Sequence, residues 1–250
     1  MQKVENITPY GVTGDNRPKG AQVRDMFDSI APAYDLMNRM MTLGIDKRWR
    51  RKCVDTVHKA GAVDILDLAT GTADLAIRMA QLIPTSNITG VDLSPAMVDI
   101  GNKKVKETGL AGRVTLQTGD ILNLPFADNS FDAVTIAFGV RNLEQLDKGY
   151  SEMLRVLRPG GTLVVLELTE PSSPLVRPLY RLYTRHVIPA AGRLVSHDGR
   201  AYTYLPESIS AVPARQSMTH IMAAAGFVNA AYRNLVAGVA AIYTASKPSD

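Results

Sequence analysis

Residues 63–76, VDILDLATGTADLA, decide the fold. An apolar run ends at Asp67, a turn of small residues follows, and apolar residues then recur at helical spacing. A strand, a tight turn and a helix in this order form the nucleotide-binding unit of parallel α/β sheets. The turn holds one glycine, Gly71, whereas loops that cradle a pyrophosphate use several. We therefore expect this turn to bind a ligand without a phosphate.

The same alternation of apolar runs and helical stretches continues along the chain. Strands are predicted near residues 63–69, 87–92, 113–118, 130–138 and 162–168. Helices are expected between them, near residues 72–83, 95–108 and 143–157. Residues 227–247 predict a final hairpin of two strands. The prediction is an α/β fold with a seven-stranded, mostly parallel sheet and helices on both faces.

The chain is predicted to form one domain, residues 1–250, in which the N-terminal helices and an insertion pack over one edge of the sheet. Residues 1–20 are a polar, mobile lead-in, and residues 21–60 carry apolar residues at helical intervals and predict an N-terminal helical cap. Residues 170–215 follow the fifth strand, hold six prolines and interrupt the strand–helix rhythm. We interpret them as a lid or insertion of helices and loops.

Composition excludes several classes of protein. A single cysteine, Cys53, rules out an intrachain disulfide, and no Cys/His spacing predicts a metal site. The net charge of +4 allows an anionic partner, but no basic run or stacking motif points to nucleic acid. No signal peptide or spanning segment is visible, so a cytoplasmic location is expected.

Acidic residues end the next two strands and indicate which ligand the turn binds. Asp92 ends the second strand, where a carboxylate accepts hydrogen bonds from ribose hydroxyls. Asp120 ends the third, where Asp120-Ile121 can frame an adenine. Adenosine without phosphate points to S-adenosylmethionine (SAM) as the cofactor. The alternatives, a nicotinamide site or ordinary helix caps, do not account for three such signals at successive strand ends.

These motifs resemble a known family. The segments DLATGTADLA, GVDLSPAMV, LPFADNSFDAVTIAFGVRN and MLRVLRPGGTLVVLEL, with YDLMN and YTYLPESI, are similar to the ubiquinone/menaquinone biosynthesis C-methyltransferases, from about Val23 to Ser246. The resemblance implies a class I methyltransferase, Rossmann-like fold. It also implies SAM contacts at Thr70, Asp92 and the pair Asp120-Ile121, beside the turn residues Asp67 and Gly71. Ala137 aligns with a further contact that is often a serine, so only its backbone can serve.

Two departures from the family pattern lie in the N-terminal helices. Asp46 stands where histidine is common, and Thr42 stands where serine is common. Neither residue touches the cofactor motifs. We interpret both as tolerated changes.

The implied reaction methylates a ring carbon of a polyprenyl quinol, and three residues are expected to serve it. Arg141 stays protonated and should stabilise a phenolate, unless it only pairs with Glu144. Asn142 and Tyr34 should hydrogen-bond quinol oxygens. Asp67 should organise the SAM loop rather than act as a base. The general base is left open, with the histidines of the insertion as candidates, namely His186 and His197.

The substrate and partners follow from the same resemblance. Demethylmenaquinol is favoured, the alternatives being a polyprenyl methoxy-benzoquinol of ubiquinone biosynthesis or a non-catalytic scaffold in a quinone biosynthetic complex. A homodimer is mildly favoured. Arg177, Arg181 and Arg185 recur at i, i+4 and i+8, beside apolar residues, and predict weak peripheral binding to an anionic membrane surface, at the inner face of the cytoplasmic membrane.

Overall fold

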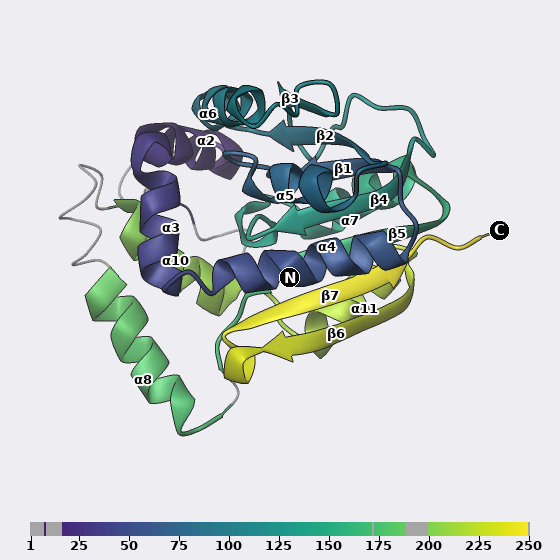
Figure 1. The fold of residues 1–250 in the computed structure, drawn as a ribbon. Helices are drawn as coiled ribbons and strands as arrows, with labels where there is room; N and C mark the ends of the chain where they lie inside the picture. The colour runs from purple at the N-terminus through teal and green to yellow at the C-terminus, as the bar shows by residue number, and fades with distance from the viewer. Residues whose placement is uncertain (1–7, 9–16, 172, 189–199, 250) are drawn as a thin grey trace.

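A seven-stranded sheet forms the centre of the computed structural model, which describes residues 8, 17–171, 173–188 and 200–249 (Figure 1). The strand order is β3-β2-β1-β4-β5-β7-β6. β1 to β5 are parallel, and β7 runs antiparallel to both β5 and β6. The strands are β1 (Asp64–Leu68), β2 (Asn87–Asp92), β3 (Val114–Thr118), β4 (Phe131–Ala137), β5 (Leu157–Leu168), β6 (Val228–Leu235) and β7 (Ala240–Ser246). The predicted fold class is confirmed.

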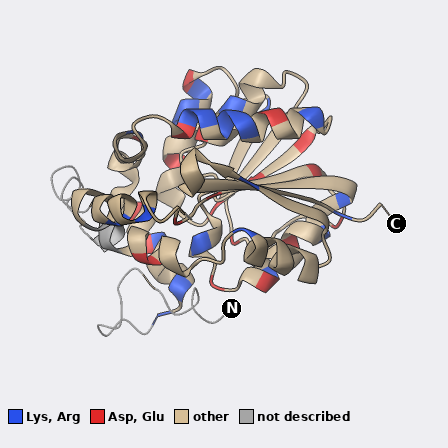
Figure 2. Cartoon of the chain, turned by 90° about the horizontal axis from the view of Figure 1, so that it is seen from below, with Lys and Arg blue, Asp and Glu red and all other residues tan. Residues whose placement is uncertain are grey.

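Helices cover both faces of the sheet because its central strands are buried on both sides. One core cluster joins the sheet to α4 (Asp46–Lys59), α5 (Asp74–Leu82) and α6 (Pro95–Glu107). The other joins it to α7 (Leu146–Val156) and α11 (Gln216–Ala224). α4 therefore covers a sheet face, and its outer side shows as a band of blue basic residues in Figure 2.

The N-terminal helices α2 (Lys19–Ile30) and α3 (Tyr34–Thr42) stand beyond the carboxyl ends of the parallel strands (Figure 1). A single 3-10 turn, Ala31–Ala33, separates them, because Pro32 cannot continue the α2 hydrogen bonds. Leu43 and Gly44 both have positive φ and end α3, which turns the chain into α4. Two breaks therefore separate three helices, of which α2 and α3 share one core cluster and α4 packs on the sheet.

The segment after β5 also folds into helices. α8 (Val176–Leu182) runs into a π-helical turn, Tyr183–Val187, and α10 (Arg200–Ala211) follows. The Tyr183 hydroxyl donates a hydrogen bond to the Met41 carbonyl at 3.0 Å, which ties this segment to α3. The insertion and the N-terminal helices thus enclose the same end of the sheet. No helix within the described ranges is long and apolar enough to cross a membrane.

Candidate active site

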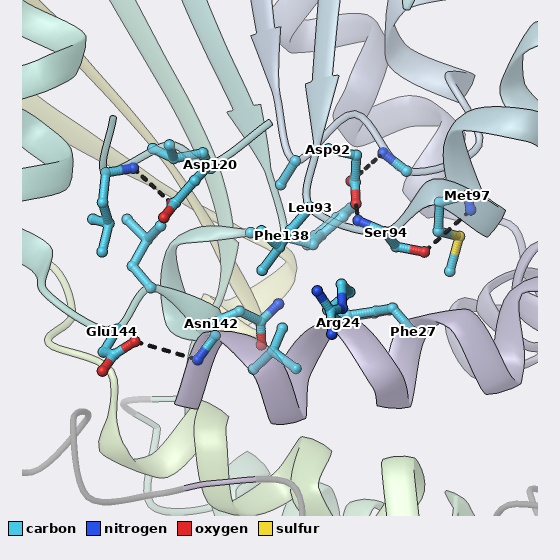
Figure 3. A pocket seen from close by; sticks show the side chains of 18 of the residues that line it. Arg24, Phe27, Asp92, Leu93, Ser94, Met97, Asp120, Phe138, Asn142 and Glu144 are labelled. Carbon is cyan, nitrogen blue, oxygen red and sulfur yellow. Dashed lines mark hydrogen bonds between the residues drawn. The ribbon is translucent and has the colours of Figure 1, made fainter. Parts of the chain in front are cut away.

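A pocket of about 730 Å³, its open mouth included, lies at the carboxyl ends of β1, β2 and β4 and under α2. Figure 3 shows Arg24 and Phe27 of α2 on one side and Asp92 with the following loop on the other. Five of the predicted cofactor residues line it: Gly71, Asp92, Asp120, Ile121 and Ala137. Successive strand ends therefore do converge on one cavity.

We call this cavity the cofactor pocket, because five of the residues predicted to bind the cofactor line it. Asp92 is its most fully hydrogen-bonded carboxylate. Its two carboxylate oxygens accept hydrogen bonds from the Gly71 N–H at 2.7 Å and the Ser94 N–H at 2.9 Å. Burial raises the pKa of Asp92, and these N–H groups act in the opposite direction. A carboxylate offers about four acceptor positions, so two of them are left for hydroxyl groups of a ligand.

The one-glycine turn is shaped by backbone conformation. Ala69, Gly71 and Ala73 all have positive φ, which non-glycine residues rarely adopt. A β-carbon on Gly139, at the end of β4, would lie 2.5 Å from the Ala69 β-carbon. Strand β4 can therefore approach the turn closely only because residue 139 is glycine.

Asp67 and Thr70 lie beneath the turn rather than in the cofactor pocket. The Asp67 carboxylate is buried and accepts hydrogen bonds from the hydroxyls of Thr70 at 2.7 Å and Thr135 at 2.6 Å. Burial raises the pKa of Asp67 to about 6. Both residues line a smaller cavity with Arg50 and Thr72, which adjoins the cofactor pocket at Gly71.

Asp120 and Ala137 reach the pocket in different ways. Asp120 accepts a hydrogen bond from the Leu122 N–H at 2.9 Å, so its loop is fixed. Ala137 lines the wall but has no polar side-chain atom. On α2, residues spaced by about one helical turn complete the wall, namely Gly20, Val23, Arg24 and Phe27. These four positions lie on one side of a helix, a spacing that the sequence shows, but they were not predicted as part of the site.

A second cavity, of about 980 Å³ with its mouth, lies between α3, α4, α8 and α10. Its lining is mostly apolar and includes Met41, Trp49, Leu168, Tyr183, Ile188 and Leu205. It shares Tyr34 and Phe138 with the cofactor pocket. The two cavities therefore meet at one wall. We call the second cavity the acceptor pocket, after the methyl acceptor that is expected from the sequence.

The shared wall is held on several sides. Phe138 has a positive φ of 61°, and its N–H donates to the Leu166 carbonyl at 2.7 Å. The Arg50 guanidinium lies 5.4 Å from its ring centroid, which is cation–π distance. Tyr34 packs edge-on against Phe27 at 5.9 Å, and burial raises the pKa of its hydroxyl. Tyr34 thus presents a protonated hydroxyl at the wall.

Arg141 and Asn142 face different cavities. Arg141 lines the acceptor pocket and Asn142 the cofactor pocket. Arg141 pairs with Glu167 at 2.8 Å, between Nη1 and Oε1, while its Nε has no partner among the described residues. Glu144, the partner considered from the sequence, instead accepts from the Gly20 N–H at 3.3 Å.

Asn142 accepts a hydrogen bond from the Tyr204 hydroxyl at 3.2 Å, so α10 fixes its amide. The two histidine candidates add nothing to the lining that the structure describes. His186 is exposed and lines neither cavity. His197 lies outside the described residues. Glu167, the ion-pair partner of Arg141, was not predicted from the sequence.

The sequence was compared with models of protein families and with known proteins. The model of the ubiE/COQ5 methyltransferase family matches residues 15–247. A demethylmenaquinone methyltransferase of Porphyromonas gingivalis is 46% identical over 99% of this chain and 100% of its own length. A ubiquinone/menaquinone biosynthesis C-methyltransferase UbiE of Geobacter sulfurreducens is 44% identical over 98% of this chain and 94% of its own.

Solved structures show the same fold at lower identity. The [4+2]-cyclase SpnF superposes with a TM-score of 0.67 at 22% identity, covering 92% of this chain and 97% of SpnF. At this identity the likeness concerns the fold alone. A cyclase on this fold also shows that architecture does not determine the reaction.

Proposed function

The chain belongs to the ubiE/COQ5 methyltransferase family, and on that premise we propose that it methylates a ring carbon of demethylmenaquinol in menaquinone biosynthesis. It is a SAM-dependent C-methyltransferase. The observation that carries the proposed acceptor is the pair of adjoining cavities. A pocket with the carboxylates of Asp92 and Asp120 in its lining and a mostly apolar pocket beside Arg141 meet at Tyr34 and Phe138.

The cofactor pocket fits SAM by the chemistry of its donors and acceptors. Asp92 has acceptor positions left for the two ribose hydroxyls, and Asp120-Ile121 border the space for an adenine. The adjoining small cavity offers Arg50 and Thr72 to the amino-acid end. The bound cofactor supplies an electrophilic methyl group on a sulfonium.

The acceptor pocket fits a quinol ring by its shape and its spare donor. Its walls are mostly apolar, as a prenylated aromatic ring requires, and Arg141 Nε is a buried donor for which the described part of the chain offers no partner. An unpaired buried donor is costly, so a ligand oxygen that accepts from it is favoured. Arg141 would stabilise the negative charge on a quinol oxygen while that charge moves to the ring carbon.

Other residues of this chain orient the ring and exclude water. Tyr34 keeps its proton and can donate to a quinol oxygen from the shared wall. Asn142, fixed by Tyr204, faces the cofactor side. The helices α8 and α10 cover the acceptor pocket and separate the ring from bulk solvent, which holds the reacting carbon in one orientation.

The test is methyl transfer by purified protein from labelled SAM. We expect label in a prenylated naphthoquinol, located on the ring carbon by mass spectrometry. Preferential labelling of a methoxy-benzoquinol would move the protein to ubiquinone biosynthesis. Tight SAM binding without transfer to either quinol would support the scaffold alternative.

We further propose that apolar residues around the acceptor pocket touch the membrane that holds the substrate. The most exposed are Leu43 (83%), Leu175 (82%) and Leu179 (70%), on the α3–α4 turn and beside or in α8. Lys47 and Arg48, in the first turn of α4, lie exposed just after Leu43. Such a mixture of leucine and basic side chains suits an anionic bilayer surface.

The arginines predicted to make this contact are in part engaged within the protein. Arg181 pairs with Glu170 at 2.8 Å, and Arg177 Nε donates to the Pro171 carbonyl at 3.0 Å. The side chain of Arg185 is outside the described residues. The leucines therefore carry more of this proposal than the arginines. The homodimer expected from the sequence remains a prediction that analytical ultracentrifugation can test.

A further inference from the structure

The acceptor pocket contains a carboxylate that the proposed reaction has not used. Asp46, the first residue of α4, is buried and lines the pocket beside Trp49 and Arg50. Among the described residues, Asp46 is the one acidic side chain in this lining. A buried carboxylate in an apolar pocket needs hydrogen-bond donors to offset the loss of water.

The donors around Asp46 leave one of its oxygens only partly satisfied. Oδ2 pairs with Arg50 Nη1, which also balances the charge of the carboxylate. Oδ1 lies 2.8 Å from the Thr42 hydroxyl, but that hydroxyl also lies 2.7 Å from the Asn38 carbonyl. A threonine hydroxyl has one hydrogen, so the two acceptors compete for it. Asp46 Oδ1 therefore has acceptor capacity for a ligand donor.

The acceptor pocket thus offers two complementary polar groups. Asp46 Oδ1 can accept a hydrogen bond, and Arg141 Nε, which has no partner among the described residues, can donate one. A hydroquinone has a hydroxyl at each end of its ring, and each hydroxyl can both donate and accept, so its chemistry matches both groups. An oxidised quinone has carbonyl oxygens only, which can accept from Arg141 but cannot donate to Asp46.

We propose that Asp46 makes the acceptor pocket selective for the reduced hydroquinone over the oxidised quinone. This inference rests on the proposed function. A quinone in the pocket would place a carbonyl oxygen against the Asp46 carboxylate and leave that acceptor without a donor. Sites that hydrogen-bond a hydroxyl reject analogues lacking it because their buried polar groups are left unpaired.

Such selectivity serves the chemistry. An oxidised ring is electron-poor and cannot attack a methyl group through its carbon, so a bound quinone would only block the site. In the reduced ring, loss of the hydroxyl proton sends the oxygen's electron pair toward the ring carbon. That carbon forms the new bond to methyl as the bond from sulfur breaks. The hydrogen on that carbon then moves as a proton to the ring oxygen through water, which restores the aromatic ring and its hydroxyl. The proton first lost from the hydroxyl is the one proton released to solvent overall.

The test uses the single tryptophan of the chain, Trp49, which lines the acceptor pocket. Its fluorescence is titrated anaerobically with a short-chain prenylated 1,4-naphthoquinone, and separately with the same compound after reduction. Wild-type protein should bind the reduced form about tenfold or more tightly. Equal midpoints for wild-type protein would overturn the proposal without any variant being made.

The variant Asp46→Asn removes the charged acceptor at nearly constant size. We expect its preference for the reduced form to fall to about threefold or less, mainly because the quinone binds better. The matched control is Asp55→Asn, on the same helix. Asp55 forms an i,i+4 ion pair with Arg51 at 2.8 Å, but both side chains are about half exposed. This control should keep the wild-type preference.

Turnover and SAM affinity, measured on the same proteins, distinguish a failure of the Asp46 proposal from a failure of the proposed function. If Asp46→Asn lowers the turnover number while the preference stays at its wild-type value, Asp46 positions Arg50 and does not select the redox state. SAM affinity of the variant, measured by calorimetry, shows whether the fold is intact. If wild-type protein prefers the reduced ring but transfers no methyl group to it, the proposed function fails and the selectivity stands.

Discussion

Replacing Glu167 with glutamine should destabilise the protein far more than a single charge change usually does. The Glu167 side chain is fully buried and holds Arg141 by an ion pair at 2.8 Å. It also accepts the backbone N–H groups of Arg141 at 3.1 Å and Leu168 at 2.8 Å. Glu167→Gln leaves the Arg141 cation without its counter-charge. It also replaces one carboxylate oxygen by an NH2 group, which then faces the backbone N–H of either Arg141 or Leu168.

The expected magnitude follows from that burial. Breaking a buried pair by removing one partner costs about 3–5 kcal/mol. For a domain of this size each kcal/mol lowers the melting temperature by about 2–4 °C, so a decrease of about 6–20 °C is expected. Urea unfolding followed by far-UV circular dichroism measures the free energy, and calorimetry measures the melting temperature.

Two further variants make the result specific. Asp55→Asn removes one partner of a half-exposed pair and should cost under about 0.5 kcal/mol. The double variant Arg141→Met with Glu167→Gln contains no uncompensated charge and should regain most of the lost stability. A loss below about 1 kcal/mol in Glu167→Gln, or no recovery in the double variant, would refute this reasoning about the pair.

Four other changes test the site. Asp92→Ala should weaken SAM binding by about 2–3 kcal/mol in calorimetry, since the ribose loses a charged acceptor; unchanged affinity would move the ribose elsewhere. Arg141→Ala should lower kcat more than SAM affinity, and the reverse pattern would assign Arg141 to the cofactor. Burial raises the pKa of Asp67 in the folded state from 3.8 to about 6. Between these two pH values the folded state binds more protons than the unfolded state. The free energy of unfolding that this group contributes is therefore present at low pH and is lost as pH rises through that window. Urea unfolding of Asp67→Asn should therefore show stability relative to wild type rising by about 2 kcal/mol from pH 4 to 7, and a flat difference contradicts the assignment. Exchanging Leu43, Leu175 and Leu179 for serine should reduce co-sedimentation with anionic vesicles while SAM binding stays intact, and equal sedimentation would exclude this face.

The sheet and the cofactor residues were accessible from the sequence because their signals are local. Apolar runs mark buried strands, and an acidic residue just past such a run lies at the carboxyl end of the sheet. Asp92 and Asp120 follow from this rule alone. The same rule placed Asp67 at the site, although the structure buries its carboxylate beneath the turn, bound to Thr70 and Thr135.

Of the acceptor pocket, the sequence indicated Arg141 and Tyr34, through the family resemblance. The rest of its lining was not predicted, because its walls come from segments far apart in the chain. Glu167 meets Arg141 only because β4 and β5 are parallel neighbours, whereas Glu144 is close in sequence but bonds to Gly20. Asp46 was noted in the sequence only as a departure from the family pattern, and no local signal predicts that it lines a pocket. Its partner Arg50 is one helical turn away, and the same spacing in Arg51 and Asp55 gives an exposed pair.

Under the proposed function, SAM and the quinol both pack against the wall of Tyr34 and Phe138 that the two pockets share, which would make their binding thermodynamically coupled. Each ligand that packs against this wall reduces its freedom, so the second ligand has less ordering left to impose. By reciprocity, any factor by which SAM raises quinol affinity must equal the factor by which the quinol raises SAM affinity. Methylation converts both ligands at once, and the wall then faces two products whose mutual coupling is different. Cooperativity measured with the substrates therefore need not hold for the products.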